Sequence, residues 1–513
     1  MKQRISAFLL VLAVAAGCAV NPVTGERELV LVGVDRQIAM GEQNYLPMRQ
    51  AQGGQYDIDP ELTEYVQSVG QKLAAVSDLD LPYEFVVLNN SVPNAWALPG
   101  GKIAVNRGLL TALDSEAELA AVLGHEIVHA AAGHSANQIE RGMLLQGLVL
   151  GTAIATSDSD YGRLAVMGAN VGAQLVNLKY GREAELEADY YGMQYMSEAG
   201  YDPQGAVSLQ KTFVELAEEQ NTDRSWLAGL FSSHPPSEER VQANIRTAAS
   251  LPPGGIIGEE RFEEAMAKTM EVRPAYEAYD AGRKALAEGN TELALEKADK
   301  AISIFPGEAH FYALRGDARM VNGRYERAVE SYDEAIERRD DFFYYYLQRG
   351  LAYNELGREE RAVDDLQKSL TYLPTAPAHY TLGNIALERG NRAAAVEHLK
   401  VVAGGQGEMA EAARASLIRL DLAQNPASYI LTGCDADSEG NLVVLVKNNT
   451  PVPVTDVGIA VQFRNDAGVP RRLDRRIGGV IPPGQVVSLR TGLGPYVPGS
   501  ACPVQVIGAR VAR

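Results

Sequence analysis

A short motif in the first half of the chain joins two histidines to a carboxylate at a spacing suited to metal chemistry. His125 and His129 lie four residues apart, and Glu126 follows the first of them. On a helix this spacing puts both imidazoles on one face, about 40° apart, so they can ligate one zinc ion. Glu126 can then take a proton from a water that the metal has made more acidic. The flanks at 116–124 and 130–132 favour a helix, so the motif predicts metal-assisted hydrolysis.

An acidic stretch further along the chain can supply the third protein ligand that a catalytic zinc needs. Residues 183–189 read Glu-Ala-Glu-Leu-Glu-Ala-Asp. Helical spacing gives two candidate pairs on opposite faces, Glu183 with Glu187 and Glu185 with Asp189. Spacing alone does not choose between these pairs, and the pair that is not used forms an acidic solvated face.

These segments together resemble peptidase family M48. The His-Glu-x-x-His motif at 125–129 is followed by Glu-x-x-Ala-Asp at 185–189, and further similar segments lie at 94–101 and 200–203. The resemblance extends over roughly residues 20–250. It implies an α+β, mostly helical, zincin-type metallopeptidase domain, with one Zn2+ per chain.

The resemblance also implies a role for each site residue. Glu185 would be the third zinc ligand, after His125 and His129. Asp189 would support catalysis by reaching a ligand histidine and fixing its tautomer. Residues 94–106 would form a hairpin and edge strand above the zinc, where an extended peptide could pair.

Five further histidines need an assignment. His234 begins a His-Pro segment that Arg240 follows, and in the family such a segment lies near the active site. His234 is therefore expected near the zinc, as a catalytic oxyanion donor or a displaceable fourth ligand; the alternative is a helix-capping histidine. His134 would point away from the metal on a continuous helix, which indicates a structural role. The others lack ligand spacing and are expected on the surface or in packing: His310, His379 and His398.

The N-terminus has the pattern of a secretory signal. Residues 1–17 combine positive charge at Lys2 and Arg4 with an apolar stretch shorter than the roughly 20 residues of a bilayer span. Residues 15–18 resemble a bacterial lipobox, which predicts lipidation of Cys18 and an anchored periplasmic protein. Ala19 favours the outer membrane of a Gram-negative bacterium. The alternative is ordinary cleavage that leaves Cys18 free.

If Cys18 carries lipid, two cysteines remain. Cys434 and Cys502 both lie in the last segment of the chain, and they can form a disulfide in an oxidising compartment.

Two apolar stretches at 143–155 and 164–176 are short and interrupted. They are expected to be core helices or helices that cover the active site.

A repeat follows a helix-breaking Pro-Pro-Gly-Gly cluster at 252–255. Glycines recur at 34-residue intervals at 282, 316 and 350, with 383 one residue short of the next step. Parallel sets keep the same register: Gly289, Gly323, Gly357 and Gly390, and Ala294, Ala328, Ala362 and Ala395. This period, with small residues where helices cross, looks like tetratricopeptide repeats. A helix at 412–422 could cap the array.

The sequence therefore predicts a multidomain protein. Residues 1–17 are the signal, 18–250 the peptidase domain and 259–425 an all-α repeat array. Short β-rich runs separated by turns predict an antiparallel β-sandwich at 428–513.

The net charge and the domain organisation limit the classes of function to consider. A formal net charge of −19 argues against nucleic acid as a ligand. The leading hypothesis is a zinc endopeptidase of the bacterial envelope that serves protein quality control. It would cleave misfolded or stalled envelope proteins, and its repeats would dock substrates or the outer-membrane assembly machinery. The alternative is a periplasmic chaperone or assembly-scaffold lipoprotein whose peptidase site is largely silent.

Overall fold

The computed structural model describes residues 18–29, 32–137, 180–218, 233–464, 470–497 and 501–512. The chain divides into two compact units, Met1–Thr375 and Ala376–Arg513. This division falls inside the predicted repeat segment, and the domain boundaries drawn from the sequence stay predictions. The predicted signal and the apolar stretches at 143–155 and 164–176 lie outside the described residues.

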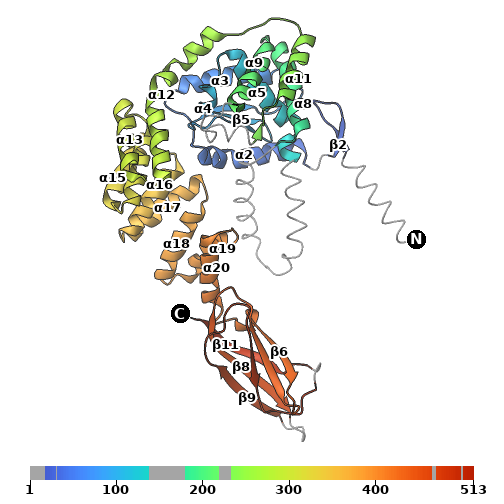
Figure 1. Ribbon diagram of the computed structural model, residues 1–513, viewed down its shortest axis with the longest axis vertical. Coiled ribbons are helices and arrows are strands. Elements are labelled where there is room, and N and C mark those ends of the chain that lie inside the picture. The colour runs from blue at the N-terminus through green and yellow to red at the C-terminus, as the bar shows by residue number, and fades with distance from the viewer. Residues whose placement is uncertain are drawn as a thin grey trace, which may run out of the picture. The chain divides into compact units, whose positions relative to one another are not determined.

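A small mixed sheet organises the N-terminal part of the first unit (Figure 1). Its order is β3-β5-β4, with β3 (Glu84–Leu88) parallel and β4 (Ala95–Leu98) antiparallel to β5 (Lys102–Asn106). The β4–β5 turn contains Gly100 and Gly101, whose φ values of +84° and +88° suit glycine. The hairpin expected at 94–106 is present, and β4 is an edge strand of this sheet.

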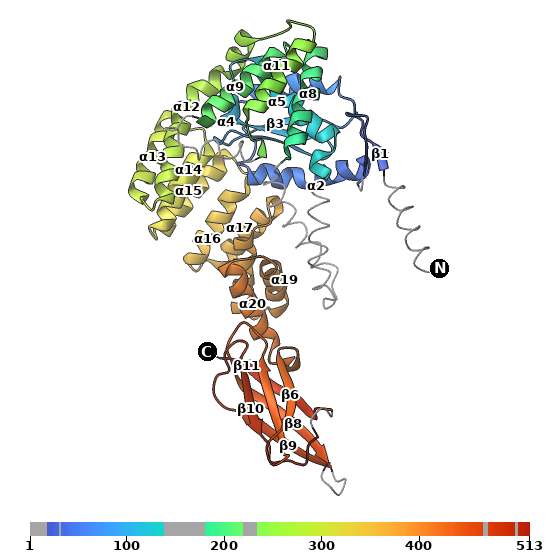
Figure 2. The same ribbon diagram turned by 45° about the vertical axis from the view of Figure 1, so that its right-hand side comes forward.

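Helices cover both faces of the sheet (Figures 1 and 2). Alternate strand residues point to opposite faces, and this divides the apolar side chains into two clusters. Val86 and Leu88 pack toward α2 (Val34–Ala51). Phe85 and Val87 join the larger core with α3 (Pro60–Ala74) and α5 (Glu116–Ala131).

Helix α5 carries the His-Glu-x-x-His motif, and every residue in it is buried. Ser115 caps its start, because the hydroxyl oxygen accepts a bond of 3.2 Å from the Glu118 amide. Helices α8 (Arg182–Glu198) and α9 (Gln204–Glu218) pack against α5, α11 (Glu238–Ser250) packs against both of them, and the short α4 (Arg107–Leu110) follows β5. Strands β1 (Cys18–Val20) and β2 (Arg27–Leu29) form a separate hairpin.

Two glycines allow α5 and α8 to approach closely beside the motif. A Cβ atom added to Gly192 on α8 would lie 2.9 Å from the His125 amide nitrogen. One added to Gly124 on α5 would lie 3.0 Å from the Gly192 carbonyl oxygen. Larger side chains here would separate the helices, so this glycine pair sets how near α8 comes to His125.

The repeat segment forms successive helix pairs, as predicted. Those of the first unit are α12 (Glu259–Ala287), α13 (Thr291–Ile304), α14 (Ala309–Val321), α15 (Tyr325–Arg338), α16 (Phe343–Glu355) and α17 (Glu359–Tyr372). The second unit contains α18 (Ala376–Glu388), α19 (Arg392–Ala403) and α20 (Glu408–Asp421). The last of these overlaps the capping helix expected at 412–422.

The structure explains the two glycine registers. A Cβ on Gly316 would lie 2.5 Å from the Tyr332 ring, so the first set marks positions where paired helices touch. Gly323 follows α14 with a φ of +67°, so the second set marks left-handed residues that end helices.

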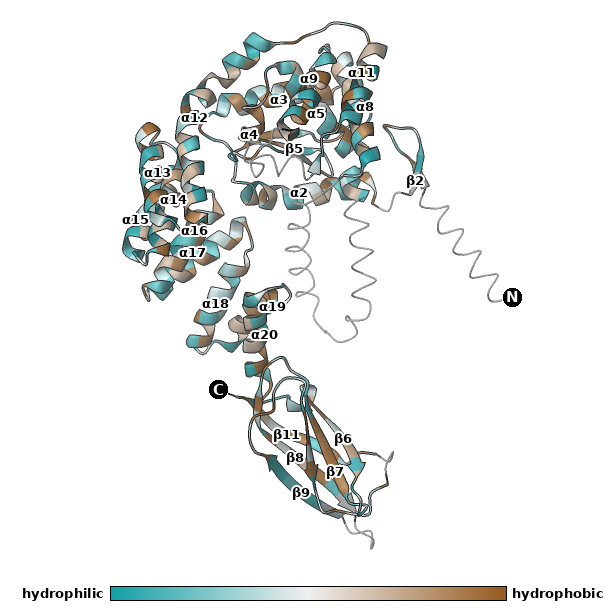
Figure 3. Cartoon of the chain, in the orientation of Figure 1, coloured by the Kyte–Doolittle hydropathy of each residue, from teal (hydrophilic) through white to brown (hydrophobic). Residues whose placement is uncertain are grey.

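The end of the second unit contains two antiparallel three-stranded sheets, β10-β7-β6 and β11-β8-β9. The strands are β6 (Ile430–Ala436), β7 (Leu442–Asn448), β8 (Val454–Arg464), β9 (Pro470–Ile477), β10 (Val486–Arg490) and β11 (Val504–Val511), and a 3-10 turn, η2 (Pro426–Ser428), precedes them. Both sheets contribute to one apolar core, through Val444 of β7 and Ile459 of β8 among others. Figure 3 shows the contrast between these apolar strands and the hydrophilic, arginine-rich β9.

Within the part of the chain that the structure describes, no helix has the length and apolar character needed to cross a membrane.

Candidate metal centre

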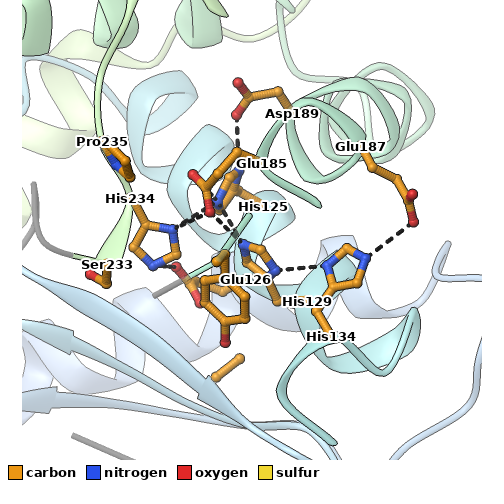
Figure 4. Close-up of polar contacts among 12 residues, drawn as sticks. His125, Glu126, His129, His134, Glu185, Glu187, Asp189, Ser233, His234 and Pro235 are labelled. Carbon is orange, nitrogen blue, oxygen red and sulfur yellow. Dashed lines mark hydrogen bonds and ion pairs between the residues drawn. The ribbon is translucent and has the colours of Figure 1, made fainter. Parts of the chain in front are cut away.

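Four buried side chains from three segments converge beside α5. His125 and His129 come from α5, Glu185 from α8, and His234 from the segment before α11 (Figure 4). One donor atom of each lies within 4.8 Å of all the others. His125 Nε2 is 3.0 Å from His129 Nε2 and 3.2 Å from His234 Nδ1, and His234 Nδ1 is 3.0 Å from Glu185 Oε1.

The structure separates the two acidic pairs that helical spacing left open. Glu185 is 2 % exposed and lies in the cluster, while Glu183 is exposed to solvent. Glu187 lies on another side of α8, where its carboxylate is 3.2 Å from His134 Nε2. Figure 4 shows Glu187 and His134 pointing at each other, with the His134 ring lying between Glu187 and His129.

Asp189 and Arg240 contact the cluster through His125 and Glu185. Asp189 Oδ1 lies 2.9 Å from His125 Nδ1, which leaves the other ring nitrogen free to face the cluster. The Arg240 guanidinium donates to both Asp189 oxygens at 2.7 Å and pairs with Glu185 Oε2 at 2.7 Å. Arg240 is 5 % exposed, so the two carboxylates share a buried counter-charge.

This arrangement controls the charge of each group. Burial alone would raise the pKa of Glu185, but His234 and His125 hold it well below its usual range. Burial likewise acts to raise the pKa of Asp189, and Arg240 keeps it low. For His129 burial dominates and lowers the pKa well below its ordinary value. Glu185 and His129 therefore take the forms that bind metal, whereas for His234 the nearby Glu185 and Glu126 outweigh the effect of burial and raise the pKa.

Glu126 lies next to the cluster without being part of it. It is 2 % exposed, its Oε1 is 3.5 Å from His234 Nε2, and its Oε2 has no hydrogen-bond partner among the described residues. Burial raises the pKa of Glu126, against the opposing effect of His234 and His125. A carboxyl group with a raised pKa beside a metal site is suited to exchange protons.

Two residues that contact His129, Tyr180 and His134, carry no spacing signal in the sequence. The Tyr180 ring stacks on the His129 imidazole with centroids 3.8 Å apart, and its hydroxyl is 2.7 Å from Ser135 Oγ. His134 lies against the other ring nitrogen, with the two Nδ1 atoms 2.8 Å apart. The sequence offers one clue to the role of Tyr180: it is an aromatic residue directly before the helix that carries Glu185.

The remaining predicted site residues lie elsewhere. Cys434 in β6 and Cys502 before β11 have their sulfurs 2.05 Å apart, so the bond would join the two C-terminal sheets. Cys18 begins β1. His310 contacts the Gly53 carbonyl, and the other two histidines contact each other across α18 and α19: His379 and His398.

The cluster fits a zinc ion. Imidazole nitrogens and a carboxylate oxygen are zinc ligands, and here they converge in a buried site. Glu126 Oε2 is buried with no hydrogen-bond partner in the described part of the chain, as expected beside a group that would complete the site. His125, His129, Glu185 and His234 are the residues that would hold the metal.

This helix motif, its supporting carboxylate and the buried donor set define a metallopeptidase domain. The comparisons agree with that class. The description Peptidase family M48 matches residues 60–247, and two tetratricopeptide repeat descriptions match residues 316–357 and 343–374. Residues 60–247 are therefore an M48 peptidase domain, and tetratricopeptide repeats follow it.

Curated relatives match up to about half of this chain. The beta-barrel assembly-enhancing protease of Yersinia pestis is 28% identical over 264 residues, which are 48% of this chain and 53% of that protein. The mitochondrial metalloendopeptidase OMA1 of Schizosaccharomyces pombe is 33% identical over 224 residues, 43% of this chain and 64% of that protein. Metalloprotease YcaL of Escherichia coli is 32% identical over 167 residues, which are 31% of this chain and 60% of that protein. The chain spans about half the length of the first of these relatives.

Proposed function

We propose that the chain is a zinc-dependent endopeptidase of the bacterial envelope that cleaves misfolded or stalled envelope proteins. The observation that carries the proposal is the buried, partly unpartnered Glu126 beside the four-group cluster. In the buried site, zinc would polarise a water molecule and the carbonyl of the peptide bond. Glu126 would take the proton from the attacking water and pass it to the leaving amine.

Other residues position these groups. Asp189 holds the tautomer of His125, and Arg240 holds both Asp189 and Glu185 in place. The edge strand β4 lies beside α5, and no strand among the described residues pairs with its outer edge, where an extended peptide could pair, although the Ala97 carbonyl already accepts a bond from Ser135 Oγ. These contacts support a peptide, rather than a small ester or amide, as the substrate.

We assign His234 as a displaceable fourth ligand. Its Nδ1 faces Glu185 and His125 within the donor cluster, whereas catalysis requires an open position on the metal. With His234 in this position the site is closed, and this favours the second candidate, a chaperone or scaffold whose peptidase site is largely silent. His234→Ala should raise cleavage if His234 blocks the site, while loss of an oxyanion donor would lower it about 100-fold or more.

The cellular setting is part of the proposal. The similar proteins of Yersinia pestis and Escherichia coli are called beta-barrel assembly-enhancing proteases, which supports envelope proteins as substrates. The repeats would bind those substrates or the assembly machinery. Lipidation at Cys18, outer-membrane anchoring and a β-sandwich at 428–513 complete the proposal. The shared core of the two C-terminal sheets supports the sandwich.

The decisive experiment is Glu126→Gln. The variant should keep one zinc per chain and the wild-type fold, but lose about 100-fold to 10,000-fold of its cleavage of an unfolded protein, because an amide cannot accept the proton. Zinc content and cleavage are measured on the same preparation. Cleavage by Glu126→Gln at the wild-type rate would remove the proposed mechanism. If the wild type, the Glu126→Gln variant and the His234→Ala variant all fail to cleave, the result would favour the chaperone.

A further inference from the structure

A small cavity lies between α4, α5, α8, α9 and α11, directly beside the metal centre. His125, Glu126 and His234 form one side of it. Val122, Met193 and Phe213 are among the apolar residues that form its walls. The cavity therefore begins at the groups that would surround a scissile peptide bond and extends into the core of the domain.

Polar side chains other than the metal-site groups also line the cavity: Asp189, Gln210, Arg240 and Asn244. Gln210 on α9 lines it and is 5 % exposed, yet its side-chain Oε1 has no hydrogen-bond partner among the described residues. A buried amide oxygen without a partner costs free energy, so a polar group in a core cavity needs an explanation. The catalytic scheme does not use Gln210. A ligand that supplies a hydrogen-bond donor inside the cavity would satisfy it.

The size of the cavity limits that ligand. Its volume is about 40 Å³, and a single water molecule needs at least roughly 10–15 Å³ by the same kind of measure. The space suits a side chain of a few heavy atoms and is too small for an aromatic ring. Threonine and serine meet both requirements, because each carries a hydroxyl donor on a short side chain.

We propose that this cavity is a specificity pocket for the substrate residue next to the scissile bond, and that Gln210 selects a short hydroxyl side chain there. The inference rests on the proposed peptidase function and names its substrate preference. Threonine would donate its hydroxyl to Gln210 and place its methyl group against the apolar walls. Valine has the same shape but would leave Gln210 unpartnered.

The test begins with an unfolded protein, reduced and carboxymethylated casein, digested by the zinc-loaded full chain. Mass spectrometry of the products locates the position at which short side chains are enriched. Two synthetic peptides that differ only by threonine or valine at this position are then compared. Wild type should favour threonine about tenfold in kcat/KM, because a buried unsatisfied acceptor penalises valine.

Two substitutions of Gln210 should change this preference in different ways. Gln210→Met keeps the volume and removes the acceptor, so the threonine preference should fall to less than about twofold. Gln210→Ala enlarges the pocket, so leucine should become a better substrate than valine, a gain that damaged folding does not produce. Gln204 is exposed at the start of the same helix and outside the cavity, and Gln204→Met should keep the wild-type ratio.

A binding measurement makes the test independent of turnover. Calorimetry with zinc-loaded Glu126→Gln should show tighter binding of the threonine peptide, and the difference should vanish in Glu126→Gln combined with Gln210→Met. Glu126-dependent cleavage with an unchanged threonine-to-valine ratio in Gln210→Met would overturn the pocket and leave the peptidase function standing. Absence of Glu126-dependent cleavage, with equal binding of both peptides, would overturn both.

Discussion

Replacing Glu185 by glutamine tests the ligand set most directly. The substitution keeps the size of a side chain that is 2 % exposed, and removes its charge from between three histidines and Arg240. Loss of a ligand should exceed the 10-fold to 100-fold cost of losing a supporting contact. Zinc affinity should therefore fall by more than about 100-fold, or roughly 2.7 kcal/mol.

The stability of the zinc-free protein should fall by somewhat less than the free energy of zinc binding does. Breaking a buried ion pair by removing one partner typically costs about 3–5 kcal/mol. Arg240 keeps both of its bonds to Asp189, however, so it is not left unpaired. We expect a loss of about 2 kcal/mol, below that range, so the fold should survive while zinc is lost.

Glu187→Gln is the matched control, two residues away on the same helix. Its carboxylate pairs with His134 at 3.2 Å, and its side chain is 26% exposed. The substitution should cost at most about 1 kcal/mol and leave one zinc per chain. Zinc content after gel filtration, competition with a chelator and thermal unfolding by circular dichroism give the three quantities. If Glu187→Gln loses zinc while Glu185→Gln keeps it, the assignment of the metal centre is wrong.

Four further predictions follow from other parts of the chain. Gly192→Ala should lower both stability and zinc affinity. Its Cβ would lie 2.9 Å from a backbone nitrogen of α5, and overpacking of about 1–3 kcal/mol exceeds the roughly 1 kcal/mol gained in helix propensity. Cys434 and Cys502 should resist alkylation without a reductant, and reducing them should destabilise the C-terminal sheets by about 4 kcal/mol, from the chain-entropy cost of a 68-residue loop. Burial raises the pKa of Asp317 from 3.8 to about 6. The stability that its protonated form contributes is therefore fully present below pH 3.8 and is lost as the pH rises through about 6. Asp317→Asn should remove this part of the pH dependence in thermal unfolding. Cys18→Ser should abolish lipid labelling and release the protein from membranes; recovery of the unmodified protein in the soluble periplasm would contradict the lipobox prediction.

The sequence by itself determined the parts that depend on local periodicity. Spacing along one helix was enough to pair His125 with His129, because residues four apart share a face whatever surrounds them. The 34-residue repeat was equally visible, because each helix pair needs its own small residue where helices touch and its own glycine where a helix ends. The hairpin around Gly100 and Gly101 was expected from the family resemblance and is present in the structure.

Helical spacing did not decide which groups meet; the family resemblance implied part of the set, and the tertiary structure brings the side chains together. Glu185 rather than Glu187 reaches the cluster because of the face that α8 turns toward α5, and Gly124 and Gly192 let the two helices come close there. The contact of His234 Nδ1 with His125 joins residues 109 positions apart, and no sequence period encodes such a distance. Gln210 in a cavity beside the metal is likewise a product of packing, because helix spacing shows which face a residue occupies but not what that face meets.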